Sequence, residues 1–433
     1  MREPSPGVGP VVLTRGGPAR TRAGGVPGER LTDFGRQVHA RPAVVYAPRT
    51  AAQAADAVVE ATASGRVVVP RGRGHSVDGQ TVVEGSALLD LSRSRAVHEV
   101  TPVEVTVDAG ATWRDVLAAT LPRGLAPVVV PDFLDLTVGG TVSVGGISGI
   151  SHRYGTAADH VRRAVVVGAD GVPLDLGRGD PLLDRVLTGQ GRYGVLVTVT
   201  LALREVPGRV RRSDIVTGTL ADHVDVQRRL LDTGAVHWLE GTAVRGPDGA
   251  LSWTTRLAQP EDLDASALMM DRTRGWSDFP DFLERADRVV RGEQEAGRWT
   301  RDAHPRLQTI LPLEEGRRVV DELLARAPAE PLGPGGAIMV YVTLADALRR
   351  LAVRGDAGGH ALVVGWQRTA PCGDEAALAR MQEANRRVAA LTAEVGGVLY
   401  GAGRAVGADG SWPRGTSGEL PGGGAVRGST DAR

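Results

Sequence analysis

The spacing of apolar residues predicts a mixed α and β region near the start of the chain. Short β-branched runs at Val44–Tyr46 and Val67–Val69 are typical of strands. Between them, Thr50 and Gln53 form a capping pattern before apolar residues spaced three and four apart. This pattern predicts a helix that ends near Gly65.

The pattern continues with predicted strands and then changes. Strands are predicted at 87–91, 103–109, 161–168 and 195–203, with a helix at 113–121. From about residue 208 to 395, longer amphipathic helices alternate with strands such as Ala361–Trp366. The clearest helix runs from Asp374 to Glu394. The length gives a prior of roughly two to three domains.

Neither end of the chain shows such periodicity. Residues 1–37 are rich in Gly, Pro and Arg and are expected to form a mobile leader, with order beginning near Arg41. Residues 401–433 carry ten glycines and are expected to be disordered on composition alone.

Composition excludes several classes of partner. The formal net charge is +0, with all positive charge from arginine, so no nucleic-acid or anionic-membrane partner is expected. The single cysteine, Cys372, cannot form an internal disulfide, and no metal site is predicted. Without a secretory signal or a run of about 18 apolar residues, a soluble cytoplasmic protein is expected. Oligomeric state is not predicted.

A glycine-rich loop directly after the second strand is the first candidate for chemistry. Residues 71–76 read Arg-Gly-Arg-Gly-His-Ser, and Gln80 follows. Such glycines let backbone N–H groups face an anion such as a diphosphate, which would place His75 beside the bound group. The alternative is a glycine-rich hairpin with a solvated histidine. The third glycine of the Rossmann fingerprint is absent.

A second glycine-rich string follows at residues 131–149. It contains five glycines and four hydroxyl residues among apolar ones, a composition that suits a chain wrapped around a large ligand with polar edges. The alternative is a glycine-rich turn in which Asp132, after a proline, caps a helix.

In this order and spacing, the two strings resemble the cytokinin dehydrogenases. The resemblance extends over about 41–400 and includes residues 188–195, 238–241, 304–305 and 383–387. It implies an α+β protein with the FAD-binding fold of the vanillyl-alcohol oxidase and p-cresol methylhydroxylase type. The expected division is a leader at 1–37, an FAD-binding domain at 38–207, a substrate cap at 208–395 and an atypical Gly-rich tail at 396–433.

The resemblance also implies the cofactor and its contacts. FAD is expected to be bonded covalently, through its methyl group, to His75. One such link is expected, because the second glycine-rich string has no cysteine. The resemblance assigns further FAD contacts to Arg71, Gly72, Arg73, Gly74, Ser76, Gln80, Asp132, Thr137, Ser143, Ile147 and Leu196.

The reaction implied is oxidation of a secondary amine, an N6-substituted adenine. Hydride passes to flavin N5, and the resulting imine is hydrolysed to adenine and an aldehyde, with oxygen or a quinone as electron acceptor. Asp132 matches the carboxylate that hydrogen-bonds the substrate amine. Glu240 matches a second acid on the cap side, with a surface carboxylate at a strand end as the alternative.

The sequence departs from the family after Tyr400. Family members continue with Tyr-Asp-Pro and Leu-x-Pro-Gly-Gln patterns that cover one flavin edge, whereas this chain continues with its Gly-rich tail. A change of reading frame is the favoured interpretation and would weaken FAD binding. Two rival functions stay open: a same-fold alcohol, sugar or lactone oxidase, and a degenerate, non-catalytic flavin-binding protein.

Overall fold

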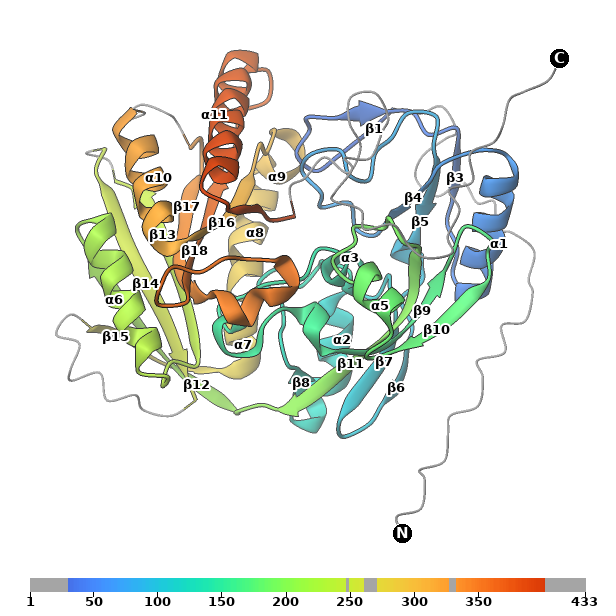
Figure 1. The fold of residues 1–433 in the computed structure, drawn as a ribbon, viewed down its shortest axis with the longest axis horizontal. Helices are drawn as coiled ribbons and strands as arrows, with labels where there is room; N and C mark the ends of the chain where they lie inside the picture. The colour runs from blue at the N-terminus through green and yellow to red at the C-terminus, as the bar shows by residue number, and fades with distance from the viewer. Residues whose placement is uncertain (1–29, 247–248, 261–270, 327–331, 402–433) are drawn as a thin grey trace, which may run out of the picture.

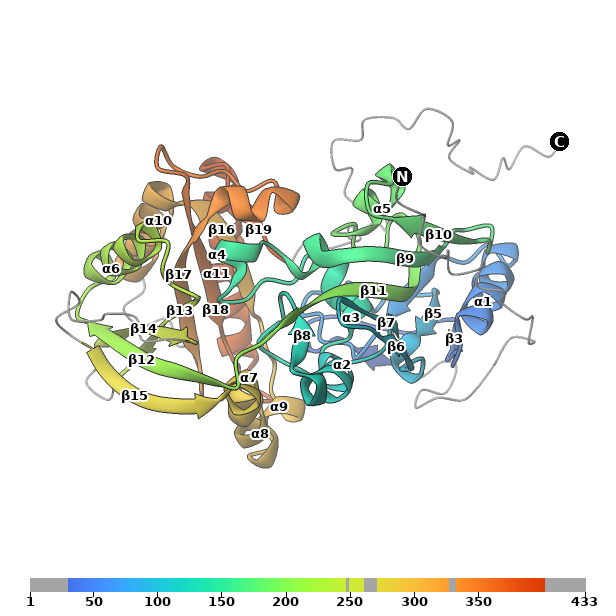
Figure 2. The same ribbon diagram turned by 90° about the horizontal axis from the view of Figure 1, so that it is seen from below.

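The computed structural model describes residues 30–246, 249–260, 271–326 and 332–401, which form two lobes side by side (Figure 1). The N-terminal lobe contains a three-stranded and a six-stranded sheet, and the C-terminal lobe is built on an eight-stranded sheet. Figure 2 shows β11 (Val195–Glu205) running towards the second lobe, where β12 (Arg209–Thr217) begins. The α+β class predicted from the sequence is confirmed.

The three-stranded sheet is parallel and ends in the first glycine-rich loop. Its order is β3 (Val44–Tyr46), β5 (Ala87–Asp90) and β4 (Val68–Arg71). The crossover between β3 and β4 is α1 (Ala51–Ala63), as parallel pairing requires. The Thr50 side chain accepts from the Gln53 N–H, which confirms the predicted helix start.

The six-stranded sheet is antiparallel and carries the core of the N-terminal lobe. Along β7, Val105 and Val107 alternate with polar residues and are fully buried. The buried Trp113 of α2 donates to Thr141 Oγ1 of α3 (2.8 Å), which fixes the two helices together. The elements are β10 (Pro173–Gly177), β9 (Val161–Val167), β11, β7 (Glu104–Asp108), β6 (Val97–Val100) and β8 (Leu125–Pro127), with α2 (Trp113–Thr120), α3 (Val138–Val142), α4 (Ser151–Tyr154) and α5 (Pro181–Val186).

The eight-stranded sheet is also antiparallel, with α6 and α10 on its outer face in Figure 1. Its order is β15 (Asp271–Asp278), β12, β14 (Leu251–Gln259), β13 (Trp238–Arg245), β17 (Ala337–Leu344), β18 (His360–Gln367), β16 (Leu307–Pro312) and β19 (Val398–Leu399). The helices are α6 (Leu220–Asp232), α7 (Phe279–Leu283), α8 (Arg285–Glu295), α9 (Arg298–Arg301), α10 (Leu313–Arg326) and α11 (Glu375–Glu394). Within the described residues, no helix is long and apolar enough to cross a membrane.

The prediction that the ordered structure begins near Arg41 was wrong. Residues 31–40 form a hairpin of β1 (Leu31–Thr32) and β2 (His39–Ala40). The buried Asp33 carboxylate holds it by accepting from the backbone N–H groups of Gln37 (3.0 Å) and Gly79 (3.0 Å). The rest of the predicted leader, residues 1–29, lies outside the described residues.

The alternation of amphipathic helices and strands predicted for residues 208–395 is present. Strands such as β12 were not predicted individually, because charged residues along them hide the alternation. After residue 396, β19 pairs with β16 and completes the sheet, so the chain is still ordered beyond the start of the predicted tail. The remaining tail, residues 402–433, lies outside the described residues.

Candidate active site

The first glycine-rich loop begins where β4 ends, at Arg71, and packs against the start of α3. A Cβ atom at Gly72 would lie 2.2 Å from Thr137 Oγ1, so only glycine fits there. Gly74 has φ +73°, a conformation that residues with a side chain rarely adopt. The loop at 71–76 and the string at 131–149 are therefore in direct contact, although they lie far apart in the sequence.

The Arg71 side chain folds back beneath this loop, where a Cβ at Gly74 would lie 2.4 Å from its Nη2. Burial lowers the pKa of Arg71, against the opposing charges of Asp90 and Asp33. Its Nη1 is buried and has no hydrogen-bond partner among the residues that the structure describes. A buried donor without an acceptor is costly, and a diphosphate oxygen would satisfy it. The loop therefore fits FAD.

His75 lies within a cluster of aromatic rings. Its ring centroid is 5.0 Å from Phe133, 5.4 Å from Phe34 and 6.2 Å from Trp299. Burial, followed by the charge of Arg73, lowers the pKa of His75 to about 4. The imidazole is therefore neutral at pH 7 and has one ring nitrogen without a proton. This packing argues against the alternative in which His75 is solvated on a glycine-rich hairpin.

Asp132 comes directly before Phe133, whose ring contacts His75. The Asp132 carboxylate pairs with an arginine from the other lobe. It accepts from Nη2 of Arg285, the first residue of α8. The Arg285 guanidinium also lies 4.2 Å from the Trp238 ring centroid and 4.6 Å from that of Phe282. Asp132 is not a helix cap, because Thr137 caps α3.

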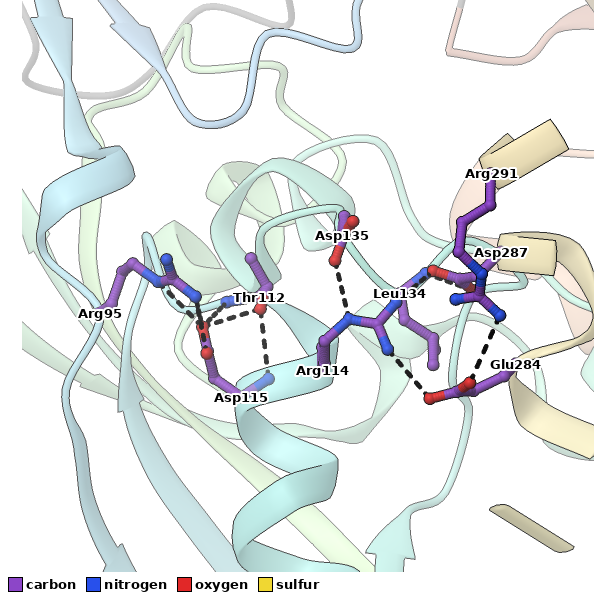
Figure 3. A network of polar contacts seen from close by, with 9 residues as sticks. All are labelled: Arg95, Thr112, Arg114, Asp115, Leu134, Asp135, Glu284, Asp287 and Arg291. Carbon is purple, nitrogen blue, oxygen red and sulfur yellow. Dashed lines mark hydrogen bonds and ion pairs between the residues drawn. The ribbon is translucent and has the colours of Figure 1, made fainter. Parts of the chain in front are cut away.

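An ion-pair network anchors this same loop to α8 (Figure 3). Arg114 donates from Nε to Asp135 Oδ1 (2.9 Å) and from Nη1 to Glu284 Oε1 (3.1 Å). The buried Asp287 accepts from Arg114 Nη2 (2.5 Å) and from the Leu134 N–H (3.3 Å). Helix α8 therefore fixes the loop in place as well as pairing with it.

Glu240 lies inside β13 rather than at a strand end, and its side chain is 18% exposed. Its carboxylate is 3.7 Å from Arg285 Nε and 3.8 Å from Arg256 Nη1. Burial, followed by repulsion from Asp132, raises the pKa of Glu240 even though both guanidiniums oppose the rise. The two predicted acids thus lie at one place, joined through Arg285.

The buried Tyr341 and the partly buried Tyr400 lie near the same acids. The Tyr400 hydroxyl accepts from the backbone N–H groups of Gly146 (3.0 Å) and Ile147 (3.1 Å). Burial raises the pKa of Tyr400 to about 12. Burial and the charge of Asp132 raise the pKa of Tyr341 well above its usual range. Both phenols are therefore protonated at neutral pH and can donate hydrogen bonds.

Comparison with known proteins is consistent with this geometry. Residues 42–177 match the model of an FAD binding domain. The chain is 32% identical over 394 residues to the uncharacterized oxidoreductase ORF5 in the fasciation locus of Rhodococcoides fascians, covering 88% of this chain and 89% of that one. The chain belongs to the cytokinin dehydrogenase-like FAD-dependent oxidoreductases.

Plant relatives match over less of their length. Cytokinin dehydrogenase 7 of Oryza sativa subsp. japonica is 35% identical over 218 residues, which cover 47% of this chain and 42% of the rice protein. Cytokinin dehydrogenase 10 of the same plant is 28% identical over 378 residues, covering 72% and 67%. The chain thus spans less than half the length of the first of these enzymes.

The other residues predicted from the sequence to contact FAD differ in their surroundings. The Ser76 carbonyl accepts from the Phe34 N–H (3.0 Å), and Gln80 Nε2 donates to the Gly401 carbonyl (3.1 Å). Ser143 Oγ donates to the Gly139 carbonyl (2.7 Å). Leu196 is buried in the core of the N-terminal lobe and pairs with Val166 of β9.

Several side chains of the site in this oxidoreductase were missed by the sequence analysis. Phe34 fell within the predicted leader, and Trp299 had no periodic pattern around it. Arg285 carried no signal, because an arginine that begins a helix is ordinarily a surface residue. Tyr400 marks the end of the family resemblance and could have been examined on that ground.

Proposed function

We propose that this oxidoreductase binds FAD covalently through His75 and oxidises a secondary amine of the N6-substituted adenine type. The observation that carries the proposal is the convergence of Asp132 and Glu240 on Arg285, in contact with the loop that packs on His75. The printed names of the plant relatives, cytokinin dehydrogenases, support the same substrate class.

The residues of the N-terminal lobe hold the cofactor. Backbone groups of residues 72–76 and the unpaired Nη1 of Arg71 receive the diphosphate. The neutral His75 imidazole offers its lone pair for the covalent bond. When bound, FAD supplies the acceptor for the hydride that leaves the carbon next to the substrate nitrogen.

The residues at the lobe boundary handle the amine. The Asp132 carboxylate accepts a hydrogen bond from the substrate N–H and takes up its proton as positive charge develops on nitrogen. Arg285 orients that carboxylate. Glu240, whose pKa is raised, can carry a proton and donate it to a ring nitrogen of the base. The product imine is then hydrolysed by water to adenine and an aldehyde.

Paired steady-state assays test this function. Isopentenyl adenine should be turned over with oxygen or a quinone as acceptor, whereas alditols should not. Turnover of alditols alone would favour the same-fold alcohol, sugar or lactone oxidase. Bound flavin without turnover of either would favour the degenerate flavin-binding protein.

The covalent bond has its own test. After acid denaturation, flavin should stay with the precipitated wild-type protein and should be absent from the precipitate of His75→Ala. A colourless wild-type precipitate from a flavin-loaded preparation would contradict the bond.

A further inference from the structure

Arg306 is a partly buried cation with no ionic partner among the residues that the structure describes. Its guanidinium lies 5.4 Å from the Phe34 ring centroid and 5.3 Å from that of Trp299. Among the described residues it has no hydrogen-bond or ion-pair partner for its side chain, and its Nε is buried. Burial lowers its pKa to about 10, against the charge of Glu293, which is itself bound to Arg298 (2.7 Å).

The rings that hold Arg306 are the same rings that hold His75. Phe34 and Trp299 contact both side chains, and Phe34 also stacks on His304, with centroids 4.6 Å apart and an interplanar angle of 6°. Backbone hydrogen bonds join the segments: Phe34 N–H to Ser76 O (3.0 Å) and His304 N–H to Gly35 O (3.0 Å). Arg306 and His75 are therefore joined through the same packed rings.

The Nε of Arg306 is a buried donor without an acceptor among the described residues, and such a donor costs stability. No described carboxylate pairs with the guanidinium, so its positive charge remains available to neighbouring groups. His75 and the cofactor that it binds are the groups within reach.

We propose that Arg306 is a positioning residue for the covalent attachment of FAD to His75: it braces the ring wall against the imidazole and supplies positive charge beside it. The inference rests on the proposed function in assuming that FAD binds at residues 71–76 and becomes attached to His75.

The attachment step explains what the charge does. The imidazole nitrogen forms a bond to the C8 methyl carbon of the flavin, while one C–H bond of that methyl group and the imidazole N–H bond break. Both protons leave, and the electron pair of the C–H bond reduces the flavin ring, which later passes two electrons to oxygen or a quinone. Positive charge nearby keeps the imidazole unprotonated and stabilises the electron-rich ring.

The charges that face His75 come from three segments. Arg71 and Arg73 of the loop and Arg306 of the C-terminal lobe disfavour its protonation, whereas Asp135 favours it. Removing Arg306 should therefore shift the acid limit of attachment to higher pH.

Attachment can be followed without any turnover of substrate. Full-length protein from riboflavin-starved cells is mixed with FAD at pH values from 4.5 to 8, and flavin in the acid precipitate is measured over time. Arg306→Met should attach FAD roughly tenfold more slowly at pH 7. Its acid limit should lie at higher pH, and Arg306→Lys should restore both features.

Two comparisons make the test decisive. Arg318→Met, at an arginine 75% exposed on α10, should behave as wild type. Wild-type rate and acid limit in Arg306→Met, or a defect in Arg306→Lys as large as in Arg306→Met, would overturn the proposal. Arg306→Gln provides a second neutral variant. Failure of both neutral variants to fold, judged by thermal unfolding, would also overturn it, since Arg306 would then be structural.

The outcome separates this inference from the proposed function. If wild-type protein retains no flavin in the precipitate, covalent attachment itself fails. If wild-type protein and Arg306→Met retain flavin equally fast, only the role of Arg306 fails.

Discussion

The two ends of the candidate site differ in the side chains that form them and in how their charges are paired. Around His75 lie aromatic rings from three segments and Arg306, a cation without an ionic partner in the described parts of the chain. Around Asp132 and Glu240, carboxylates and guanidiniums alternate within hydrogen-bond and ion-pair distance.

The difference separates two tasks that a flavin enzyme must perform in one place. An end with uncompensated positive charge attracts an anionic cofactor and keeps an imidazole neutral. An end with paired charges can take up a proton or a new positive charge with little reorganisation. The pKa values follow this division, since that of His75 is lowered and that of Glu240 is raised.

The largest expected effect divides the two ends by function. Asp132→Asn should lower kcat/KM for isopentenyl adenine by about 10²–10⁴-fold, the usual scale of general acid–base catalysis. Covalently held flavin should not change, because His75 is intact. Asp281→Asn, at an exposed acid of α7, should leave both unchanged. Loss of flavin together with activity in Asp132→Asn would mean that the ends are not independent.

Acid should destabilise the end built from rings. The pKa of His304, like that of His75, falls to about 4 in the folded protein from an ordinary 6.5. The unfolded state binds more protons between these values, so stability is full above pH 6.5 and is lost as pH falls towards 4. For His304 the loss is about 3 kcal/mol.

Urea unfolding at pH 7 and pH 4.5 measures this loss. His304→Gln should reduce the pH dependence, whereas His39→Gln, at an exposed residue, should not. An unchanged pH dependence in His304→Gln would argue against a neutral, buried His304.

Removal of Arg285 should weaken the charged end. Arg285→Met leaves the Asp132 carboxylate without its partner and loses the stacking on Trp238, at a cost of about 2 kcal/mol. Turnover should fall while flavin attachment stays normal. Arg291→Met on the same helix, at an arginine 47% exposed, is the matched control in urea unfolding. Equal effects of the two variants would show that Arg285 has no special role.

The smallest effect has the opposite pH dependence to that of His304. Because the folded state raises the pKa of Glu240, its contribution to stability is full below pH 4.5 and is lost as pH rises through the folded value. Glu240→Gln should therefore be more stable than wild type at pH 8, on the order of 1 kcal/mol. The gain should vanish at pH 4.5. A loss of stability at pH 8 would show that the pairing with Arg285 and Arg256 outweighs burial.

The sequence predicted those helices and strands whose formation depends on residues close together in the chain. The capped helix after Thr50 and the helix after Asp374 appear as predicted, because capping and apolar spacing act over a few residues. The hairpin at 31–40 was missed, since it depends on Asp33 meeting the distant Gly79. The long strand β12 was missed because charged residues mask its alternation.

The candidate site shows the same limit. The two glycine-rich strings were visible because backbone geometry requires glycine at positions such as Gly72. Arg285, Arg306 and Trp299 were not, because their roles come from contacts between lobes. Single charged or aromatic residues carry no information in sequence about which distant side chain they meet.

The most direct test of the account is an experimental structure of the flavin-loaded protein. It should show the His75 imidazole bonded to the flavin methyl group, Arg306 and Trp299 beside that edge, and the Asp132 carboxylate facing the substrate side of the same ring. A flavin ring placed away from His75, or an Asp132 carboxylate with no access to the ring, would contradict it.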